Sequence, residues 1–198
     1  MAKDKVILTD CDGVLLDWQV KFDTWVQRQG YRFRENYRSH YGIDQQLDIS
    51  KETAHDLIAR FNRGSDFEHL PPWRDSVDVV RRMHSQGWRF VVITTAGLHP
   101  WTWGLRRSNL DRVFGEGIIE ELHVLELHGD KGVKLIDYQD SGYHWIEDKP
   151  ANADLGFDYG LQPVLMNTEF NRNSIGNWPR VNTWKEIEHL ANLAGCYI

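Results

Sequence analysis

Cysteine is nearly absent from this chain of 198 residues, which contains only Cys11 and Cys196. Two cysteines so far apart in sequence cannot form the dense disulfide framework that stabilises small secreted domains. No stretch approaches the roughly 20 apolar residues that a transmembrane helix needs, and the beginning of the chain lacks the charged and apolar regions of a secretory signal. We therefore expect a cytoplasmic protein with no membrane association.

Positive charge is also scarce, because 23 Lys and Arg residues are outnumbered by 29 Asp and Glu residues, giving a formal net charge of -6. Nucleic acids are bound by clustered Lys and Arg, so this balance argues against a nucleic-acid partner. The nine histidines show no metal-ligand spacing. A hydrophobic content of 41% suffices for one core, and the length suits one domain with a modest insertion. Whether the chain forms a homodimer is left open.

Short β-branched apolar segments alternate with segments of helical periodicity along most of the chain. The expected strands are residues 5–9, 89–94, 122–127, 143–147 and 162–166. The expected helices run from Trp18 towards Gly30, from Ser50 to Gly64, from Asp75 to Gly87 and onward from Thr183. This alternation predicts an α/β fold, a three-layer Rossmann-like parallel sheet with catalytic groups at the carboxyl ends of its strands. Residues 31–49 show no clear period, and no regular structure is assigned to them.

An acidic turn, Asp10-Cys11-Asp12-Gly13, follows the first expected strand. The strand end brings two carboxylates together where backbone groups also converge, and such crowding requires a cation. An EF-hand calcium loop would need Gly at its sixth place and Glu at its twelfth, but here Gly is fourth and Lys21 is twelfth. Taken alone, the turn is either a solvated loop or a site for another divalent cation.

The turn and its surroundings resemble the first of four motifs of the haloacid dehalogenase superfamily. That motif is an apolar strand followed by Asp-x-Asp-Gly, and residues 6–15 match it. The second motif, an apolar strand ending in Thr or Ser, is matched by residues 90–94, with Thr95 as a second hydroxyl. The order of the motifs and their placement at strand ends extend the resemblance over nearly all of the expected sheet domain.

The other two motifs are found in the second half of the chain. The fourth, an apolar strand ending in acidic residues, is matched by residues 143–148, with Asn152 where many members carry another acid. The third is a single lysine upstream of the fourth, and both Lys131 and Lys134 are candidates, of which Lys131 is preferred. Glu147 has no assigned role.

The resemblance implies a magnesium-dependent phosphomonoester hydrolase that works through an aspartyl phosphate. Asp10 would be the nucleophile and Asp12 the general acid and base. Mg²⁺ would be held by Asp10, Asp148 and the backbone carbonyl of Asp12. Phosphate would be bound by Thr94, a backbone amide near Thr95, and Lys131. Members that dehalogenate carbon lack an acid two residues after the nucleophile, so Asp12 favours phosphate esters.

The segment between the first two motifs commonly forms a lid in this superfamily. Here it would be a small helical cap at residues 17–70, with residues 1–16 and 71–198 as the catalytic core. The arrangement is similar to the 5′(3′)-deoxyribonucleotidases, because Trp18 stands eight residues after the nucleophile and Phe67 stands near the end of the cap. The resemblance implies that these rings clamp a nucleobase, and the alternative is that they seal the cap against the core. The expected substrate is a nucleoside monophosphate.

Three other functions stay open. The chain could be a phosphatase of another small phosphate ester, a polynucleotide 3′-phosphatase, or a catalytically inactive nucleotide-binding module. Two pairs of residues after the second motif are given structural interpretations. Trp101 and Trp103 are interpreted as packing residues rather than a leaving-group site, and Arg106 and Arg107 as a solvated helix face rather than a second phosphate site.

Overall fold

The centre of the computed structural model, which describes residues 4–194, is a six-stranded sheet in the order β3-β2-β1-β4-β5-β6. The strands are β1 (Val6–Thr9), β2 (Arg89–Thr95), β3 (Ile119–Leu125), β4 (His144–Glu147), β5 (Gln162–Met166) and β6 (Arg180–Val181). Every pairing is parallel, and Leu8 of β1 lies opposite both Val91 of β2 and Trp145 of β4. Strand β1 is thus central, which is where a doubly wound sheet places its ligand site.

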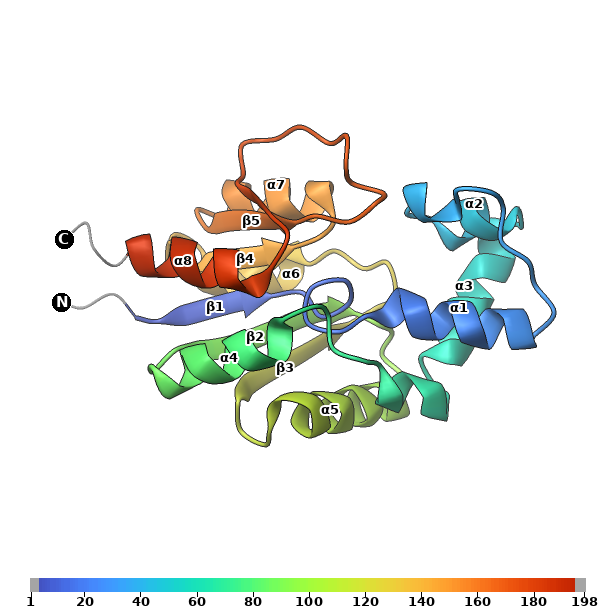
Figure 1. The fold of residues 1–198 in the computed structure, drawn as a ribbon, viewed down its shortest axis with the longest axis horizontal. Helices are drawn as coiled ribbons and strands as arrows, with labels where there is room; N and C mark the ends of the chain where they lie inside the picture. The colour runs from blue at the N-terminus through green and yellow to red at the C-terminus, as the bar shows by residue number, and fades with distance from the viewer. Residues whose placement is uncertain (1–3, 195–198) are drawn as a thin grey trace.

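Helices cover both faces of the sheet and also form a group beyond the carboxyl ends of its strands (Figure 1). The α-helices are α1 (Trp18–Arg28), α2 (Ile43–Leu47), α3 (Lys51–Phe61), α4 (Ser76–Ser85), α5 (Pro100–Phe114), α6 (Gly132–Leu135), α7 (Pro150–Asp158) and α8 (Trp184–Ala194). Short 3₁₀ helices are η1 (Tyr37–Ser39), η2 (Ser65–His69) and η3 (Ile136–Tyr138). The predicted α/β class and three-layer parallel architecture are therefore confirmed.

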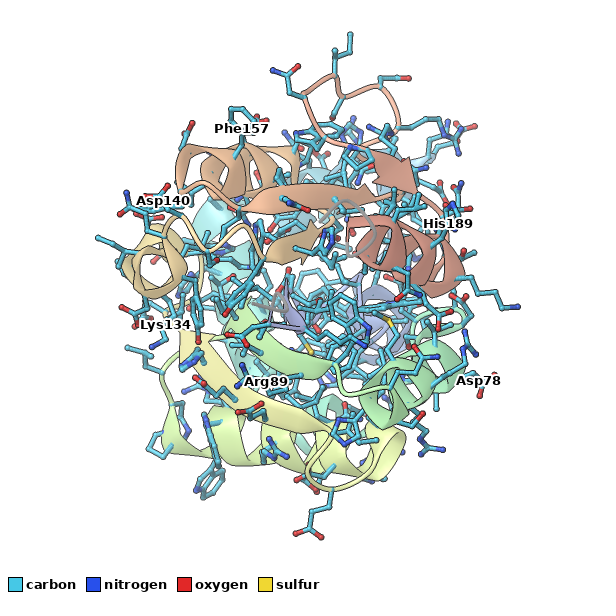
Figure 2. All side chains as sticks on the ribbon, turned by 90° about the vertical axis from the view of Figure 1, so that its left-hand side faces the viewer. Asp78, Arg89, Lys134, Asp140, Phe157 and His189 are labelled. Carbon is cyan, nitrogen blue, oxygen red and sulfur yellow. The ribbon has the colours of Figure 1, made fainter. Side chains whose placement is uncertain are left out.

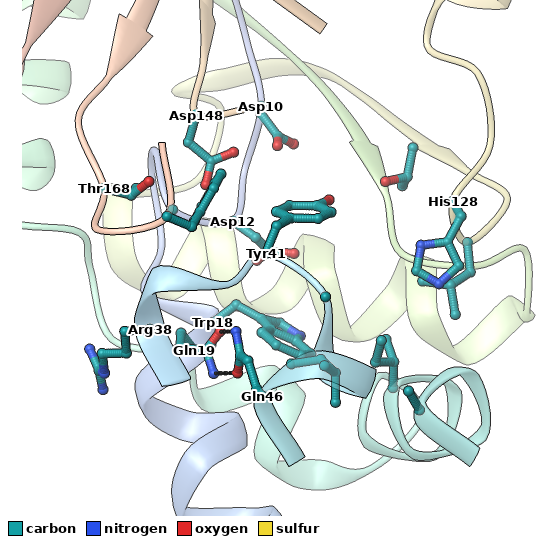
Figure 3. A pocket seen from close by; sticks show the side chains of 18 of the residues that line it. Asp10, Asp12, Trp18, Gln19, Arg38, Tyr41, Gln46, His128, Asp148 and Thr168 are labelled. Carbon is teal, nitrogen blue, oxygen red and sulfur yellow. Dashed lines mark hydrogen bonds between the residues drawn. The ribbon is translucent and has the colours of Figure 1, made fainter. Parts of the chain in front are cut away.

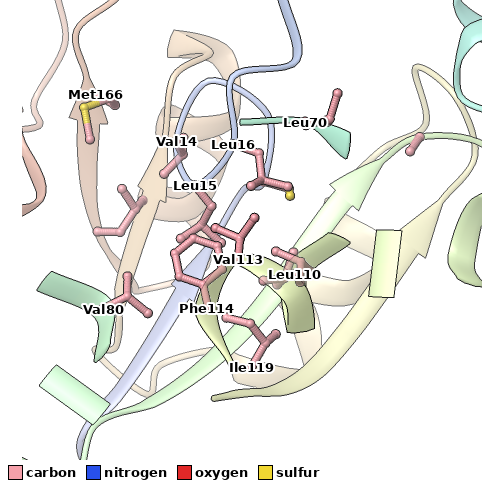
Figure 4. Close-up of a cluster of buried hydrophobic side chains, with 14 of the residues drawn as sticks. Val14, Leu15, Leu16, Leu70, Val80, Leu110, Val113, Phe114, Ile119 and Met166 are labelled. Carbon is pink, nitrogen blue, oxygen red and sulfur yellow. The ribbon is translucent and has the colours of Figure 1, made fainter. Parts of the chain in front are cut away.

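Alternate residues of β1 face the two helical layers, as the period of a strand requires. Ile7 belongs to a large cluster that includes Val80 of α4 and Phe114 of α5 (Figure 4). Leu8 belongs to a smaller cluster on the opposite face, with Leu135 of α6. Polar side chains such as that of Lys134 lie at the periphery (Figure 2). Because both faces of β1 are packed in the core, the position of the acidic turn that follows this strand is fixed.

The helices α1, α2 and α3 lie together beyond the carboxyl ends of the strands (Figure 1). Helix α1 begins after Asp17, whose carboxylate accepts a hydrogen bond from the Val20 amide, and α3 begins after Ser50, whose hydroxyl accepts from the Thr53 amide. Helix α2 lies in the segment to which no structure was assigned. It has only five residues, which is too short for a helical period to be recognised in the sequence.

Two further differences from the sequence prediction concern short or marginal elements. Strand β3 begins at Ile119 rather than at residue 122. The sequence did not indicate its first residues because Glu120 and Glu121 are exposed and interrupt the apolar pattern. Strand β6 was missed because it has two residues. No helix within residues 4–194 is both long and apolar enough to cross a bilayer. Cys11 is a buried free thiol, and Cys196 lies outside the described residues.

Candidate active site

Three carboxylates meet where β1 and β4 end side by side. The Asp10 amide donates to the Ile146 carbonyl at 2.8 Å, which extends the pairing of the two strands by one residue. One carboxylate oxygen from each of Asp10, Glu147 and Asp148 lies within 4.8 Å of the others. The structure therefore brings together residues separated by more than half of the chain, as expected for neighbouring parallel strands.

Lys131 lies between two of these carboxylates. Its ammonium group is 2.9 Å from Asp10 Oδ1 and 2.6 Å from Glu147 Oε1, and its side chain is only 2% exposed. Burial alone would lower the pKa of Lys131, but the negative charges of Asp10 and Glu147 raise it above its usual value. Lys131 is therefore a permanent buried cation. Lys134, the other candidate, forms an ion pair with Asp137 at the surface.

Glu147 is completely buried and accepts four hydrogen bonds. Its Oε1 accepts from Lys131 and from the Asn152 amide nitrogen at 2.8 Å, and its Oε2 accepts from the amides of Asp148 and Lys149. Four donors occupy the lone pairs of both oxygens. Glu147 is thus a fixed anion that orients Lys131, and Asn152 stands where it holds Glu147 in place.

Asp148 is the carboxylate of this group whose ionised form is most disfavoured by its surroundings. Burial raises its pKa well above the usual value, and the nearby charges of Glu147 and Asp10 raise it further. It approaches the acidic turn closely because residue 13 is glycine. A Cβ at Gly13, whose φ is +76°, would stand 2.3 Å from Asp148 Oδ2.

Asp12 is paired with a buried arginine from α5. Arg106 Nη2 donates to Asp12 Oδ2 at 2.6 Å, and the Arg106 side chain is 0% exposed. Its guanidinium lies 4.1 Å from the centre of the Phe67 ring. Burial raises the pKa of Asp12, although Arg106 opposes that shift. The expectation of a solvated face is wrong for Arg106, because its guanidinium is buried and pairs with the Asp12 carboxylate.

Three other residues of α5 that the sequence singled out, Trp101, Trp103 and Arg107, are at least partly exposed. Arg107 forms an ion pair with Asp111 of its own helix at 2.5 Å, with its side chain 21% exposed. Trp101 is 69% exposed and Trp103 is 49% exposed, so the interpretation of both as packing residues is wrong. Both lie in the first turn of α5, which begins at Pro100.

A cavity of about 850 Å³ opens between the acidic residues and the group α1 to α3. In the view of Figure 3, Asp10 and Asp148 lie at one end, Trp18 lies towards the other, and Tyr41 lies between them. The lining includes Asp10, Asp12, Trp18, Thr94, Thr95 and Asp148. Phe67 is not part of this lining, because it is fully buried against Phe61 and Arg106.

Trp18 is linked to the end of β2, the strand that carries the two threonines. Its indole N–H donates to Asn62 Oδ1 at 2.9 Å, and Asn62 Nδ2 donates to the Ala96 carbonyl at 3.0 Å. One face of the indole is stacked on Phe22, with ring centres 4.4 Å apart. Asn62, which the sequence did not indicate, thereby fixes the position of Trp18 relative to the end of β2.

The structure resembles many solved hydrolases. It matches the haloacid dehalogenase-like family protein SP0104 from Streptococcus pneumoniae with a TM-score of 0.65 and 10% identity, covering 96% of this chain and 99% of that chain. It matches CbbY from Rhodobacter sphaeroides, solved with phosphate, with a TM-score of 0.61 and 16% identity, covering 92% and 96%. It matches YfnB from Bacillus subtilis, a putative hydrolase solved with magnesium, with a TM-score of 0.62 and 12% identity, covering 96% and 99%.

The chain has the haloacid dehalogenase-like fold. No protein-family model matches its sequence. An uncharacterized 32.4 kDa protein from the Gp30-rIII intergenic region of Enterobacteria phage T4 is 24% identical over 198 aligned residues, which span 92% of this chain and 68% of that protein.

Within this candidate site, Arg106 is the main residue that the sequence interpretation missed. A signal was present, because Arg106 precedes Leu110, Val113 and Phe114 at the spacing of one helix face, and that face is buried. An arginine on an apolar stripe requires a buried anionic partner. Asp12 is that partner.

For the phosphate-ester hydrolysis that the sequence resemblance implies, we expect replacement of Arg106 by leucine to lower kcat about 10- to 100-fold while KM changes less than about threefold. The physical reason is that the Asp12 carboxylate loses the cation that orients it. Arg106→Lys should restore part of the rate because it keeps the charge. The measurement is steady-state phosphate release, with circular dichroism as a check on folding.

Arg107→Leu is the matched control, since Arg107 is the next residue on α5 and contacts Asp111 instead of Asp12. Its kcat should stay within about twofold of the wild-type value. Equal losses in the Arg106 and Arg107 variants would show that the orientation of Asp12 does not depend on Arg106.

Proposed function

We propose that this protein is a magnesium-dependent phosphomonoester hydrolase that forms an aspartyl phosphate on Asp10. The observation that carries the proposal is the position of Asp10 at the bottom of the cavity, between the cation of Lys131 and the carboxylate of Asp148. The haloacid dehalogenase-like fold supports it, and so does the phosphate bound to the similar CbbY. The residues at the strand ends determine the reaction, and the rest of the cavity determines which alcohol part of the ester can bind.

Asp10 is oriented for attack by contacts to one of its two oxygens. The Cys11 amide donates to Oδ1 at 2.7 Å, and Lys131 lies against the same oxygen. Oδ2 is then the oxygen that bonds to phosphorus as the ester oxygen leaves. Thr94 and the Thr95 amide donate to the phosphate oxygens, while Lys131 offsets their charge.

Asp12 moves the protons in both halves of the reaction. It donates a proton to the leaving ester oxygen in the first half and takes one from the attacking water in the second. Its raised pKa favours the protonated form that the first half requires. Water then releases phosphate and regenerates the Asp10 carboxylate.

The residues at the strand ends fit Mg²⁺. Oxygen ligands suit this ion, and the carboxylates of Asp10 and Asp148, with the Asp12 carbonyl, form a small set of such ligands beside the phosphate position. The pKa of Asp148 is raised first by burial and then by the negative charges of Glu147 and Asp10, and a cation would offset both causes. A bound Mg²⁺ would neutralise charge on the phosphate and on the nucleophile. Magnesium in the similar YfnB structure supports this assignment.

We expect Mg²⁺ at about 100 times its dissociation constant to raise the stability by about 2.7 kcal/mol, which corresponds to a rise in Tm of about 5 to 10 °C. Asp148→Asn should abolish most of that rise. Because protons compete with metal for the carboxylates and the pKa of Asp148 is raised, the rise should be larger near about pH 8 than near about pH 5.5. Thermal unfolding with and without Mg²⁺ measures each value, and an undiminished rise in Asp148→Asn would rule out Asp148 as a ligand.

We also propose that residues 17–70 act as a cap and that the substrate is a nucleoside monophosphate, as for a 5′(3′)-deoxyribonucleotidase. The cavity volume of about 850 Å³ suits a molecule of that size. Trp18 lines the cavity and has one face covered by Phe22, so its other face is the surface on which a base would stack. Phe67 lies outside the cavity, and Trp18 is therefore the single base-stacking ring of the original pair.

A phosphate-release panel in Mg²⁺ tests this proposal. It should include nucleoside monophosphates, sugar phosphates and a 3′-phosphorylated oligonucleotide, each with wild-type protein and Trp18→Ala. The proposal predicts that nucleoside monophosphates rank first and that Trp18→Ala removes their advantage over sugar phosphates. An unchanged ranking in Trp18→Ala would end the base-stacking role, whereas nucleotide binding without phosphate release would favour an inactive binding module.

A further inference from the structure

Two glutamine side chains form a pair in the part of the cavity remote from Asp10 and Asp148. Gln19 lies on α1 and Gln46 on α2, and both line the cavity. Gln19 Nε2 donates to Gln46 Oε1 at 3.0 Å, and Gln46 Nε2 donates to Gln19 Oε1 at 3.4 Å (Figure 3). Gln46 is buried, with 2% of its surface exposed. The pair is thus a fixed element of the cavity wall.

The orientation of each amide is fixed by a partner that can only accept hydrogen bonds. Gln19 Nε2 contacts Asp23 Oδ1 at 2.6 Å, and Gln46 Nε2 contacts the His40 carbonyl oxygen at 2.8 Å. A carboxylate and a backbone carbonyl have no proton to donate, so the nitrogen of each glutamine must face them. Rotating either amide by half a turn would place two oxygens in contact.

Asp23 is itself held in place. Its second oxygen, Oδ2, accepts from the Tyr37 hydroxyl and from Arg38 Nη2, each at 2.7 Å. The ion pair with Arg38 supplies a counter-charge to the Asp23 carboxylate and fixes its position. The orientation of Gln19 therefore depends on a chain of contacts that lies entirely within residues 17–70.

The consequence is a simple count of donors and acceptors. An amide has two N–H donors and an oxygen with two lone pairs. Both donors of each glutamine are occupied, by its outer partner and by the other glutamine. Each oxygen accepts one hydrogen bond within the pair and keeps a second lone pair. Towards a ligand, the pair can therefore only accept.

We propose that Gln19 and Gln46 select a substrate whose group remote from the phosphate carries N–H donors, namely an amino-bearing nucleobase. This inference rests on the proposed phosphatase function and adds the class of base. A base with a carbonyl oxygen in place of the amino group would bring an acceptor against the amide oxygens at that position, and a polar group buried without a partner loses affinity. A base stacked on Trp18 would have its polar edge among the cap residues that include this pair.

The test compares two substrates that differ in one edge of the base. The 5′-monophosphate of deoxycytidine has an amino group where that of deoxyuridine has a carbonyl oxygen. Wild-type protein should hydrolyse the cytosine nucleotide with a kcat/KM about 10-fold or more above that of the uracil nucleotide. Gln46→Met and Gln19→Met should reduce that ratio to about 1. The ratio does not depend on how much of a variant folds, because both substrates meet the same folded protein.

Gln45→Met is the matched control, since Gln45 is the neighbouring residue on α2, is exposed and does not line the cavity. Its ratio should equal that of wild type. A wild-type ratio near 1, or a ratio that Gln46→Met leaves unchanged, would overturn the inference. Turnover of sugar phosphates but of neither nucleotide would also overturn it while leaving the phosphatase reaction intact.

Absence of any turnover would contradict the proposed function instead. The inference is then judged by the dissociation constants of the same two nucleotides, measured by isothermal titration calorimetry on wild type and Gln46→Met. Tighter binding of the cytosine nucleotide by wild type alone would support it, and equal binding of both nucleotides would overturn it.

Discussion

Replacing Lys131 by methionine is expected to lower the free energy of unfolding by about 3 to 5 kcal/mol. The substitution keeps the length of the side chain but leaves the carboxylates of Asp10 and Glu147 buried without their cation. A carboxylate in that position escapes the penalty by binding a proton, so its pKa in the folded variant rises above its unfolded value. Such a shift makes the folded variant lose stability as the pH rises, and the deficit should therefore be larger at neutral than at acidic pH.

Urea denaturation of wild type and Lys131→Met across a pH series measures this deficit. Lys134→Met is the matched control, because Lys134 carries the same charge close by but pairs with Asp137 at the surface. Its unfolding free energy should change by less than about 1 kcal/mol at every pH. A Lys131 variant as stable as the Lys134 variant would show that the carboxylates do not need Lys131 as their counter-charge.

Replacing Asp10 by asparagine is expected to reduce phosphate release at least about 1,000-fold, because an amide oxygen is too weak a nucleophile to attack phosphorus. The variant should keep the fold, since asparagine retains an oxygen that can accept from the Cys11 amide and from Lys131. Mass spectrometry of acid-quenched wild-type protein should find a phosphoryl group on Asp10, and none on the variant.

Asp44→Asn provides the comparison for this experiment. Asp44 is also a carboxylate that lines the cavity, but it belongs to α2 in the proposed cap. Its removal should change kcat less than about threefold. Equal losses in the Asp10 and Asp44 variants would point to the charge of the cavity rather than to a covalent step.

The sequence could predict the acidic residues because topology brings them together. Asp10 and Asp148 each follow an apolar strand, and adjacent parallel strands end at the same edge. The preference for Lys131 over Lys134 relied on the resemblance alone. The reason became visible only in three dimensions, where Lys131 is buried between two anions and Lys134 points outward.

The sequence could not predict contacts between segments that do not follow adjacent strands of the sheet. Whether Phe67 reached the cavity depended on how η2 packs, and it packs with Phe67 against Arg106. The Gln19 and Gln46 pair joins α1 to a five-residue helix that carries no recognisable period. Trp18 lines the cavity, because it begins the helix that leaves the acidic turn directly.

The close approach of Gly13 to Asp148 makes two distant positions of the chain dependent on each other. Asp148 can stand beside the acidic turn only while residue 13 has no side chain, since a Cβ there would stand 2.3 Å from Asp148 Oδ2. Replacing Asp148 by a shorter residue without a carboxylate would make space for alanine at position 13, but the candidate metal ligand would be lost. A side chain at position 13 would therefore force the Asp148 carboxyl group to move, so the residue at position 13 constrains where a carboxylate far away in the sequence can lie.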